Sequence, residues 1–305
     1  MGALTLEAWR AGGDRFLHRG HAIFYRVTGD PTAIPALLCI HGFPTASWDW
    51  HRLWDTLGAR FACVVAPDMI GFGFSAKPRR YGYSILDQAD LHEALLGRLG
   101  IRRVHVLAHD YGDTVAQELL ARYEERRARG EDGLVLRGIC LLNGGLFPET
   151  HRARFIQKLL HSPFGPLLAR LSNEASFRRS FVPIFGAHTQ PTDAELRDFW
   201  RLCRHDGGTR ITHLLIRYMS ERRQHRERWV GALCRTAVPL RVIDGTDDPV
   251  SGRHMAERYR ALVPNPDVVL LDGIGHYPQV EDPDGVWRAF HDFLVQRVAP
   301  HAQST

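Results

Sequence analysis

The chain has 305 residues, 44% of them hydrophobic and 24% charged, which suits one large globular domain or a core with an elaboration. No stretch reaches the roughly 18 consecutive apolar residues of a membrane span, and residues 1–15 lack the apolar centre of a signal peptide. We therefore expect no integral membrane segment and a cytoplasmic protein. The five cysteines lack metal-type pairing, so we expect no metal site.

The formal charge of +5 is unevenly distributed along the chain. Residues 147–236 carry 16 Lys and Arg against 8 Asp and Glu, whereas the remainder carries 23 against 26. The basic residues of this interval are interspersed with acidic and apolar ones, and no nucleic-acid motif accompanies them. A solvated helical face is the favoured interpretation and we expect no nucleic-acid partner; docking to an anionic membrane surface or substrate is the alternative.

Hydrophobic periodicity predicts the first elements. Residues 21–29 alternate like a half-buried strand, and residues 35–40 and 61–68 form short apolar runs typical of buried strands. Between those runs, Trp50 to Leu57 have apolar residues at the spacing of a helix. Ser84 then predicts the start of a helix that Gly100 ends.

The same alternation continues downstream. We predict strands at residues 104–108, 135–143, 239–245 and 267–273, with a helix over 115–123. Apolar strands alternating with helices predict an α/β fold with a mostly parallel sheet covered on both faces. Between the predicted strands at residues 135–143 and 239–245, the interval 143–238 contains only helix-like patterns and loops. We expect a core of residues 1–145 and 237–305, with residues 146–236 as a helical cap over the strand ends.

Three polar side chains follow predicted strands, at the edge where open α/β sheets bind ligands: Asp110, Asp248 and His276. Their order is nucleophile, acid, histidine. Singly, each has a structural explanation, because Asp110 can cap a helix, Asp248 can form a turn and His276 can lie at the surface. Their joint occurrence at strand ends favours a catalytic triad.

The acid of this triad has several candidates. Asp247 and Asp248 are adjacent, and the G-x-x-D spacing from Gly245 selects Asp248. Asn143 and Glu149 follow the strand before the insert, at a second place where an acid can stand. An asparagine at the strand end favours Asp248.

An aspartate nucleophile suits saturated carbon. Attack on an sp³ carbon gives a stable alkyl ester of Asp110, and His276 can then activate the water that hydrolyses it. The segment His41–Pro44 follows a buried strand, so the backbone N–H groups of Phe43 and Tyr111 suit an oxyanion hole for that second step.

The motifs HGFPT, PDMIGFGFSAKP, AHDYG, GTDDP and GHYPQVEDP resemble the haloalkane dehalogenase and epoxide hydrolase branch of the α/β-hydrolase superfamily. From Trp9 to Leu294 the chain also resembles the vertebrate mesoderm-specific transcript family. The resemblance implies an α/β-hydrolase fold, no cofactor, and a small hydrophobic substrate, an epoxide or an alkyl halide. A pocket at these motifs would include His41, Pro44, His109, Asn143 and His151.

The two chemistries of the branch differ in what receives the leaving group. Dehalogenases of the branch hold halide with side-chain N–H donors at the positions of Phe43 and Tyr111, neither of which offers one here. Epoxide hydrolases use two cap tyrosines, and Tyr218, the only tyrosine of the insert, matches the second. His151 or His161 could replace the missing first. Packing on an apolar helix stripe is the structural alternative for Tyr218.

We therefore predict an epoxide hydrolase in which Tyr218 donates the proton to the opened oxygen. Haloalkane dehalogenation is the alternative, and other ester-type hydrolysis or ligand binding without turnover is a third. The sequence leaves open whether the protein is a monomer or a homodimer.

Overall fold

A computed structural model describes residues 4–299. An eight-stranded sheet with the order β1-β2-β4-β3-β5-β6-β7-β8 lies at its centre. Among these strands only β2 runs opposite to the others, because its pairs with β1 and with β4 are both antiparallel. The strands are β1 (Gly13–His18), β2 (His21–Gly29), β3 (Ala36–Ile40), β4 (Cys63–Pro67), β5 (Arg103–His109), β6 (Val135–Leu142), β7 (Leu240–Gly245) and β8 (Val268–Leu271).

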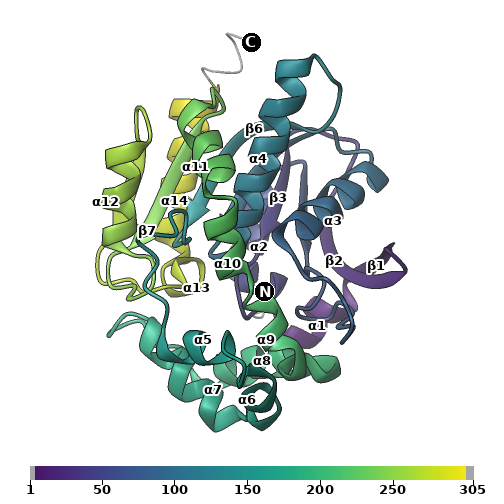
Figure 1. The fold of residues 1–305 in the computed structure, drawn as a ribbon. Helices are drawn as coiled ribbons and strands as arrows, with labels where there is room; N and C mark the ends of the chain where they lie inside the picture. Colours follow the sequence, from purple (N-terminus) through teal and green to yellow (C-terminus); the bar gives the residue numbers. More distant parts are fainter. Residues whose placement is uncertain (1–3, 300–305) are drawn as a thin grey trace.

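Helices cover both faces of this sheet (Figure 1). Two buried apolar clusters result, one on each side, because alternate residues of strands such as β5 face opposite ways: Val106 belongs to one cluster and Leu107 to the other. The α-helices outside the insert are α1 (Leu6–Ala11), α2 (Trp54–Arg60), α3 (Ile85–Arg98), α4 (Tyr111–Arg129), α12 (Arg253–Leu262), α13 (Pro278–Glu281) and α14 (Pro283–Phe293). Short turns of helix are η1 (Ser47–Trp50) and η4 (Leu294–Val298).

The α/β fold and the seven predicted strands are confirmed, with two differences. β1 was not predicted, because its sequence GDRFLH buries only Phe16 and His18 and lacks an apolar run. The helix expected from Trp50 to Leu57 is wrong as one element. A 3₁₀ turn ends at Trp50 and α2 begins only at Trp54, although Trp50, Leu53, Trp54 and Leu57 are all buried. The apolar spacing therefore indicated burial and not a continuous helix.

The insert between β6 and β7 is helical throughout its regular parts. It contains α5 (Phe155–Leu160), α6 (Gly165–Leu171), α7 (Glu174–Phe181), η2 (Val182–Ile184), α8 (Asp193–Arg204), η3 (His205–Ile211), α9 (Thr212–Leu215), α10 (Tyr218–Gln224) and α11 (Arg226–Arg235). Helices α5 to α9 lie across one end of the molecule, whereas α10 and α11 return alongside α4 (Figure 1). The Trp229 indole N–H donates to Glu118 of α4 at 2.7 Å. The division into a core and a cap at residues 146–236 stays a prediction.

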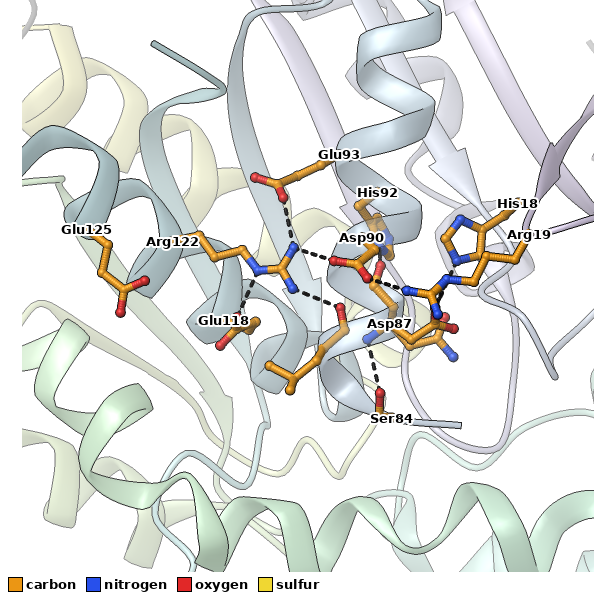
Figure 2. A network of polar contacts seen from close by, with 12 residues as sticks. His18, Arg19, Ser84, Asp87, Asp90, His92, Glu93, Glu118, Arg122 and Glu125 are labelled. Atoms are coloured by element: carbon orange, nitrogen blue, oxygen red, sulfur yellow. Dashed lines mark hydrogen bonds and ion pairs between the residues drawn. The ribbon is translucent and has the colours of Figure 1, made fainter. Parts of the chain in front are cut away.

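Helix α4, which begins at the residue after Asp110, is held against α3 by an ionic network (Figure 2). Arg122 of α4 donates to Asp90 and Glu93 of α3 at 2.7 and 2.8 Å. It also pairs with Glu118 one turn earlier, and Glu118 is buried. A partly buried arginine shared among several carboxylates keeps its geometry better than an exposed pair does. This network therefore fixes the helix that carries the site. Among residues 4–299, no helix combines the length and apolar character needed to cross a membrane.

Candidate active site

Asp110 lies on a sharp turn between β5 and α4. Its backbone has φ 48° and ψ −104°, a conformation that non-glycine residues rarely adopt because it is strained. Gly112 allows the turn to pack under the sheet, since a Cβ there would lie 2.5 Å from the Ile40 carbonyl oxygen. The strain aims the Asp110 side chain away from the helix, so it does not act as an ordinary helix cap.

His276 lies between the two aspartates predicted to accompany it. Its Nδ1–H donates to Asp248 Oδ2 at 2.7 Å, and its Nε2 is 4.0 Å from Asp110 Oδ2. All three side chains are nearly fully buried, although they come from loops after β5, β7 and β8. Asp247, the other candidate acid, is exposed and accepts a hydrogen bond from Thr246.

Asp248 is held by a set of hydrogen bonds besides that to His276. The Asn143 amide donates to its Oδ2 at 2.9 Å, and the Val250 N–H donates to its Oδ1 at 2.7 Å. The Ser251 backbone and hydroxyl both donate to Oδ2. Asn143 thus helps to hold the Asp248 carboxylate in place. Glu149 lies apart, paired with Arg226 and Arg258 at the surface.

The charged forms of His276, Asp248 and Asp110 stabilise one another. Burial would lower the pKa of His276, but Asp248 and then Asp110 raise it to about 9. Burial would likewise raise the pKa of both carboxyls, yet His276 lowers that of Asp248 to about 2 and, with Arg222, holds that of Asp110 below its usual range. The free protein therefore contains two carboxylates around one imidazolium at neutral pH.

The loop after β3 brings a backbone donor to Asp110. The Phe43 N–H donates to Asp110 Oδ2 at 3.1 Å. His41 shapes this loop: burial lowers its pKa to about 4, and the neutral ring bonds the Gly42 carbonyl and the Met69 N–H. Tyr111 is the first residue of α4, where a helix leaves its N–H without an internal acceptor.

His109 supports the site from behind. Its Nε2 lies 2.7 Å from the His276 carbonyl oxygen, which can only accept, so this nitrogen carries the proton. Burial lowers its pKa to about 3. We conclude that His109 is a neutral ring and that it holds the main chain of His276 in position.

Arg222 of α10 was not predicted from the sequence, yet it contacts the turn that carries Asp110. The residue is 2% exposed, its Nη2 donates to the Asp110 carbonyl oxygen at 3.1 Å, and the same nitrogen is 3.7 Å from Asp110 Oδ1. Its Nε donates to Thr114 at 2.7 Å. The signal lay in RYMSERRQ, where Arg222 is four residues after Tyr218 and therefore on the same helix face.

Tyr218 and His151 lie beside Arg222. The Arg222 guanidinium carbon is 4.5 Å from the centre of the Tyr218 ring, and the Tyr218 hydroxyl is buried without a partner among the described residues. Burial, and then the charge of Asp110, raise the pKa of Tyr218, so the hydroxyl keeps its proton. Burial and Arg222 lower the pKa of His151 to about 3, which leaves a neutral ring. His161 is exposed and bonds Ser220.

A cavity of about 250 Å³ opens onto Asp110 beneath the helices of the insert. Of the predicted residues, Phe43, Pro44, Asp110 and His276 line it, whereas His41, His109, Asn143, His151, Tyr111 and Tyr218 do not. Most of the remaining wall is apolar, including Leu160, Leu168, Phe177, Phe181, Ile184 and Trp200. Within residues 4–299, no group of three or more His, Cys, Asp or Glu side chains has the arrangement of a metal site.

This combination of sheet order, strained turn and strand-end residues can be compared with known proteins. A profile of the alpha/beta hydrolase fold family matches residues 35–283. The chain belongs to the α/β-hydrolase family. This α/β-hydrolase is 43% identical to the mesoderm-specific transcript protein of Mus musculus over 300 residues, covering 95% of this chain and 88% of the mouse protein.

Solved structures share the fold of this α/β-hydrolase. A haloalkane dehalogenase DbeA-M1 loop variant from Bradyrhizobium elkanii superposes with a TM-score of 0.78 at 23% identity, covering 96% of this chain and 99% of that one. The epoxide hydrolase CorEH superposes with a TM-score of 0.74 at 20% identity, covering 93% and 98%. Identities this low establish the architecture and leave the substrate open.

Proposed function

We propose that this α/β-hydrolase hydrolyses an sp³ electrophile through a covalent ester on Asp110, and that the electrophile is an epoxide. The observation that carries the proposal is the buried contact of His276 with Asp248 at 2.7 Å and with Asp110 at 4.0 Å. A carboxylate in this position gains little from attack on a carbonyl, because the product would be a mixed anhydride. Attack on saturated carbon gives an ester that the same site can hydrolyse.

In the first half of the proposed reaction, an Asp110 oxygen bonds to an epoxide carbon while the carbon–oxygen bond of the ring breaks. The released alkoxide takes the proton of Tyr218, whose raised pKa means that it carries a proton to give. Tyrosinate then lies beside the Arg222 guanidinium, which favours the anion. Arg222 thus provides part of the anion stabilisation that a second cap tyrosine would provide.

In the second half, His276 removes a proton from water and the hydroxide attacks the ester carbon of Asp110. The oxyanion that forms receives hydrogen bonds from the Phe43 and Tyr111 N–H groups. The bond between the Asp110 carboxyl carbon and the alcohol oxygen then breaks, the alcohol oxygen takes the proton held by His276, and a vicinal diol leaves. Asp110 leaves this step as a carboxylic acid and gives its proton to His276, which restores the carboxylate and the imidazolium of the free protein.

Esterification itself prepares His276 for this role. In the free protein, the negative charge of Asp110 helps to hold His276 protonated. An ester has no charge, so its formation lowers the pKa of His276, and the imidazolium gives its proton back to the Tyr218 phenolate. The neutral imidazole can then accept a proton from water. The base therefore becomes available only after the covalent intermediate exists.

The positions beside the nucleophile favour an epoxide over a halide. Phe43 lines the cavity but has no side-chain donor, and Tyr111 packs between Phe72 and Tyr218, outside the cavity wall. Neither side chain is placed to receive a halide. His151 is a poor proton donor because it is neutral, so Tyr218 is the better acid. The centre of the Tyr218 ring lies 5.9 Å from the centre of the Phe43 ring, and Tyr218 does not line the cavity. Proton donation therefore requires that the cavity wall move so that the substrate reaches the Tyr218 hydroxyl.

The test supplies an aryl epoxide, a bromoalkane and a nitrophenyl ester in parallel. We expect diol from the epoxide and loss of this activity in Asp110→Asn. A Tyr111→Phe control should keep it, since the Tyr111 hydroxyl has no part in the proposed reaction. Turnover of the bromoalkane alone would refute the epoxide assignment, and turnover of the ester alone would refute attack on saturated carbon.

A further inference from the structure

Helices α5 and α6, with the residue before α6, expose large apolar side chains that are close together in the sequence. Five of the eight exposed large hydrophobic residues of the described chain belong to this short segment; we call them the α5–α6 patch: Phe155, Ile156, Phe164, Leu167 and Leu171. Phe155 is 78% exposed and Phe164 66%. Scattered apolar residues at a surface are ordinary, but a cluster of this kind marks an interaction site.

Basic side chains without an ion pair among residues 4–299 occur in the same segment as this patch. Within residues 151–180 the only acidic residue is Glu174, which Arg178 holds in an ion pair. Five further basic residues of the interval form no ion pair within residues 4–299: Arg152, Arg154, Lys158, Arg170 and Arg179. Elsewhere, arginines such as Arg122 and Arg228 are shared among carboxylates. Of the sixteen basic residues in 147–236, eleven form no ion pair within residues 4–299, and five of these eleven lie in the interval that carries the patch.

The α5–α6 patch is continuous with the cavity that opens onto Asp110. Ile156 and Leu171 belong to the patch and also line that cavity, as does the basic residue Arg154. Helices α5 and α6 lie at the lower end of the molecule in Figure 1. An apolar compound could thus pass from a surface that covers the patch into the cavity without crossing bulk water.

We propose that the α5–α6 patch docks on the surface of an anionic phospholipid membrane. An exposed apolar helix face with a basic rim is the combination that binds at the interface of such membranes. A second copy of this chain is a poorer occupant, because a two-fold interface would place the unpaired basic residues of both copies together. The proposal concerns binding at the surface, and it does not depend on which reaction Asp110 performs.

The test is sedimentation of the whole protein with vesicles of phosphatidylcholine, with and without phosphatidylglycerol. We expect binding to the anionic vesicles that weakens with salt. Phe164→Ser with Leu167→Ser should reduce it about tenfold or more, since both side chains would lie in the acyl boundary. The matched control is Leu17→Ser with Ile34→Ser, two residues of similar exposure elsewhere, which should bind as the wild type does.

The charge contribution is tested by Lys158→Gln with Arg170→Gln. Each basic side chain near an anionic surface contributes about fivefold in affinity, so the pair should cost about 25-fold. Arg79→Gln with Arg80→Gln, two exposed arginines outside the insert, is the control. Hydrolysis of a water-soluble substrate without vesicles should be unchanged in every variant, so that failure of docking and failure of the proposed reaction are separate results.

Three outcomes would overturn the proposal. The first is no binding of the wild type to anionic vesicles. The second is equal binding by the patch variants and their controls. The third is a wild-type dimer in analytical ultracentrifugation that Phe164→Ser with Leu167→Ser converts to monomer, which would assign the patch to a second copy.

Discussion

Replacing Asp110 with asparagine should convert His276 from an acid into a base. In the free protein the pKa of His276 is raised to about 9, with Asp248 as the largest favourable contributor and Asp110 as the next charge. Asparagine keeps the shape of the aspartate but, like an ester, has no charge. The variant therefore reproduces the electrostatics of the covalent intermediate in a stable protein.

The expected change in the pKa of His276 follows from the distance between its charge and that of Asp110. His276 Nε2 and Asp110 Oδ2 are 4.0 Å apart, and two unit charges at that separation attract by about 4 kcal/mol at the effective dielectric constant of about 20 that suits protein sites. Since one pKa unit corresponds to about 1.4 kcal/mol, removing the charge should lower the pKa of His276 by about three, to near 6. That value would make it a base at neutral pH.

The assay is an NMR titration of the imidazole, with the His276 signals assigned by their loss in His276→Gln. Asp272→Asn is the matched control, because Asp272 is an exposed carboxylate, and it should leave the pKa of His276 near 9. A pKa that stays within half a unit of the wild-type value in Asp110→Asn would refute the coupling, and with it the idea that esterification prepares the base.

Three further predictions concern the same site. Tyr218→Phe should reduce epoxide turnover by on the order of 10²-fold or more while formation of product from a bromoalkane, if any, is unaffected, as measured by initial rates. Arg222→Met should raise the pKa of Asp110 and move the acidic limb of the kcat/KM profile upward, whereas Arg223→Met, at an exposed neighbouring arginine, should not. His276 has a raised pKa in the folded protein, so its contribution to stability is complete below about 6.5 and is lost as pH rises through about 9. The free energy of unfolding of the wild type relative to His276→Gln should therefore fall by about 3 kcal/mol between pH 6 and pH 10, and denaturant unfolding that shows no such change would contradict it.

The sequence predicted well those strands that are buried on both faces of the sheet. Strands such as β3 and β5 are apolar along their whole length because helices cover both faces of the sheet, and such runs are readable. The edge strand β1 has water on much of its surface and only Phe16 and His18 buried, so it lacked a pattern. The 3₁₀ turn before α2 kept its apolar spacing while the helix was interrupted, because spacing reports burial more directly than it reports continuous hydrogen bonding.

The catalytic candidates were predictable because each follows a strand at the same edge of the sheet. What the sequence did not provide was the direction of side chains that arrive from the insert. Arg222 lies in a run of arginines that resembles an ordinary charged surface, and only the return of α10 along α4 brings it to Asp110. The exposure of Phe155 was also not predicted, because Phe155 occurs at the apolar spacing of a helix, as a core residue would.

The central claim is that Asp110 forms an ester with the substrate, and trapping that ester tests it most directly. His276→Gln removes the base for the second half of the reaction and leaves Asp110 in place, so the intermediate should accumulate when the variant is incubated with an epoxide. Intact mass spectrometry should then show an increment equal to the mass of the epoxide, and peptide mapping should locate it on Asp110. No increment, or an increment on another residue, would contradict the mechanism proposed here.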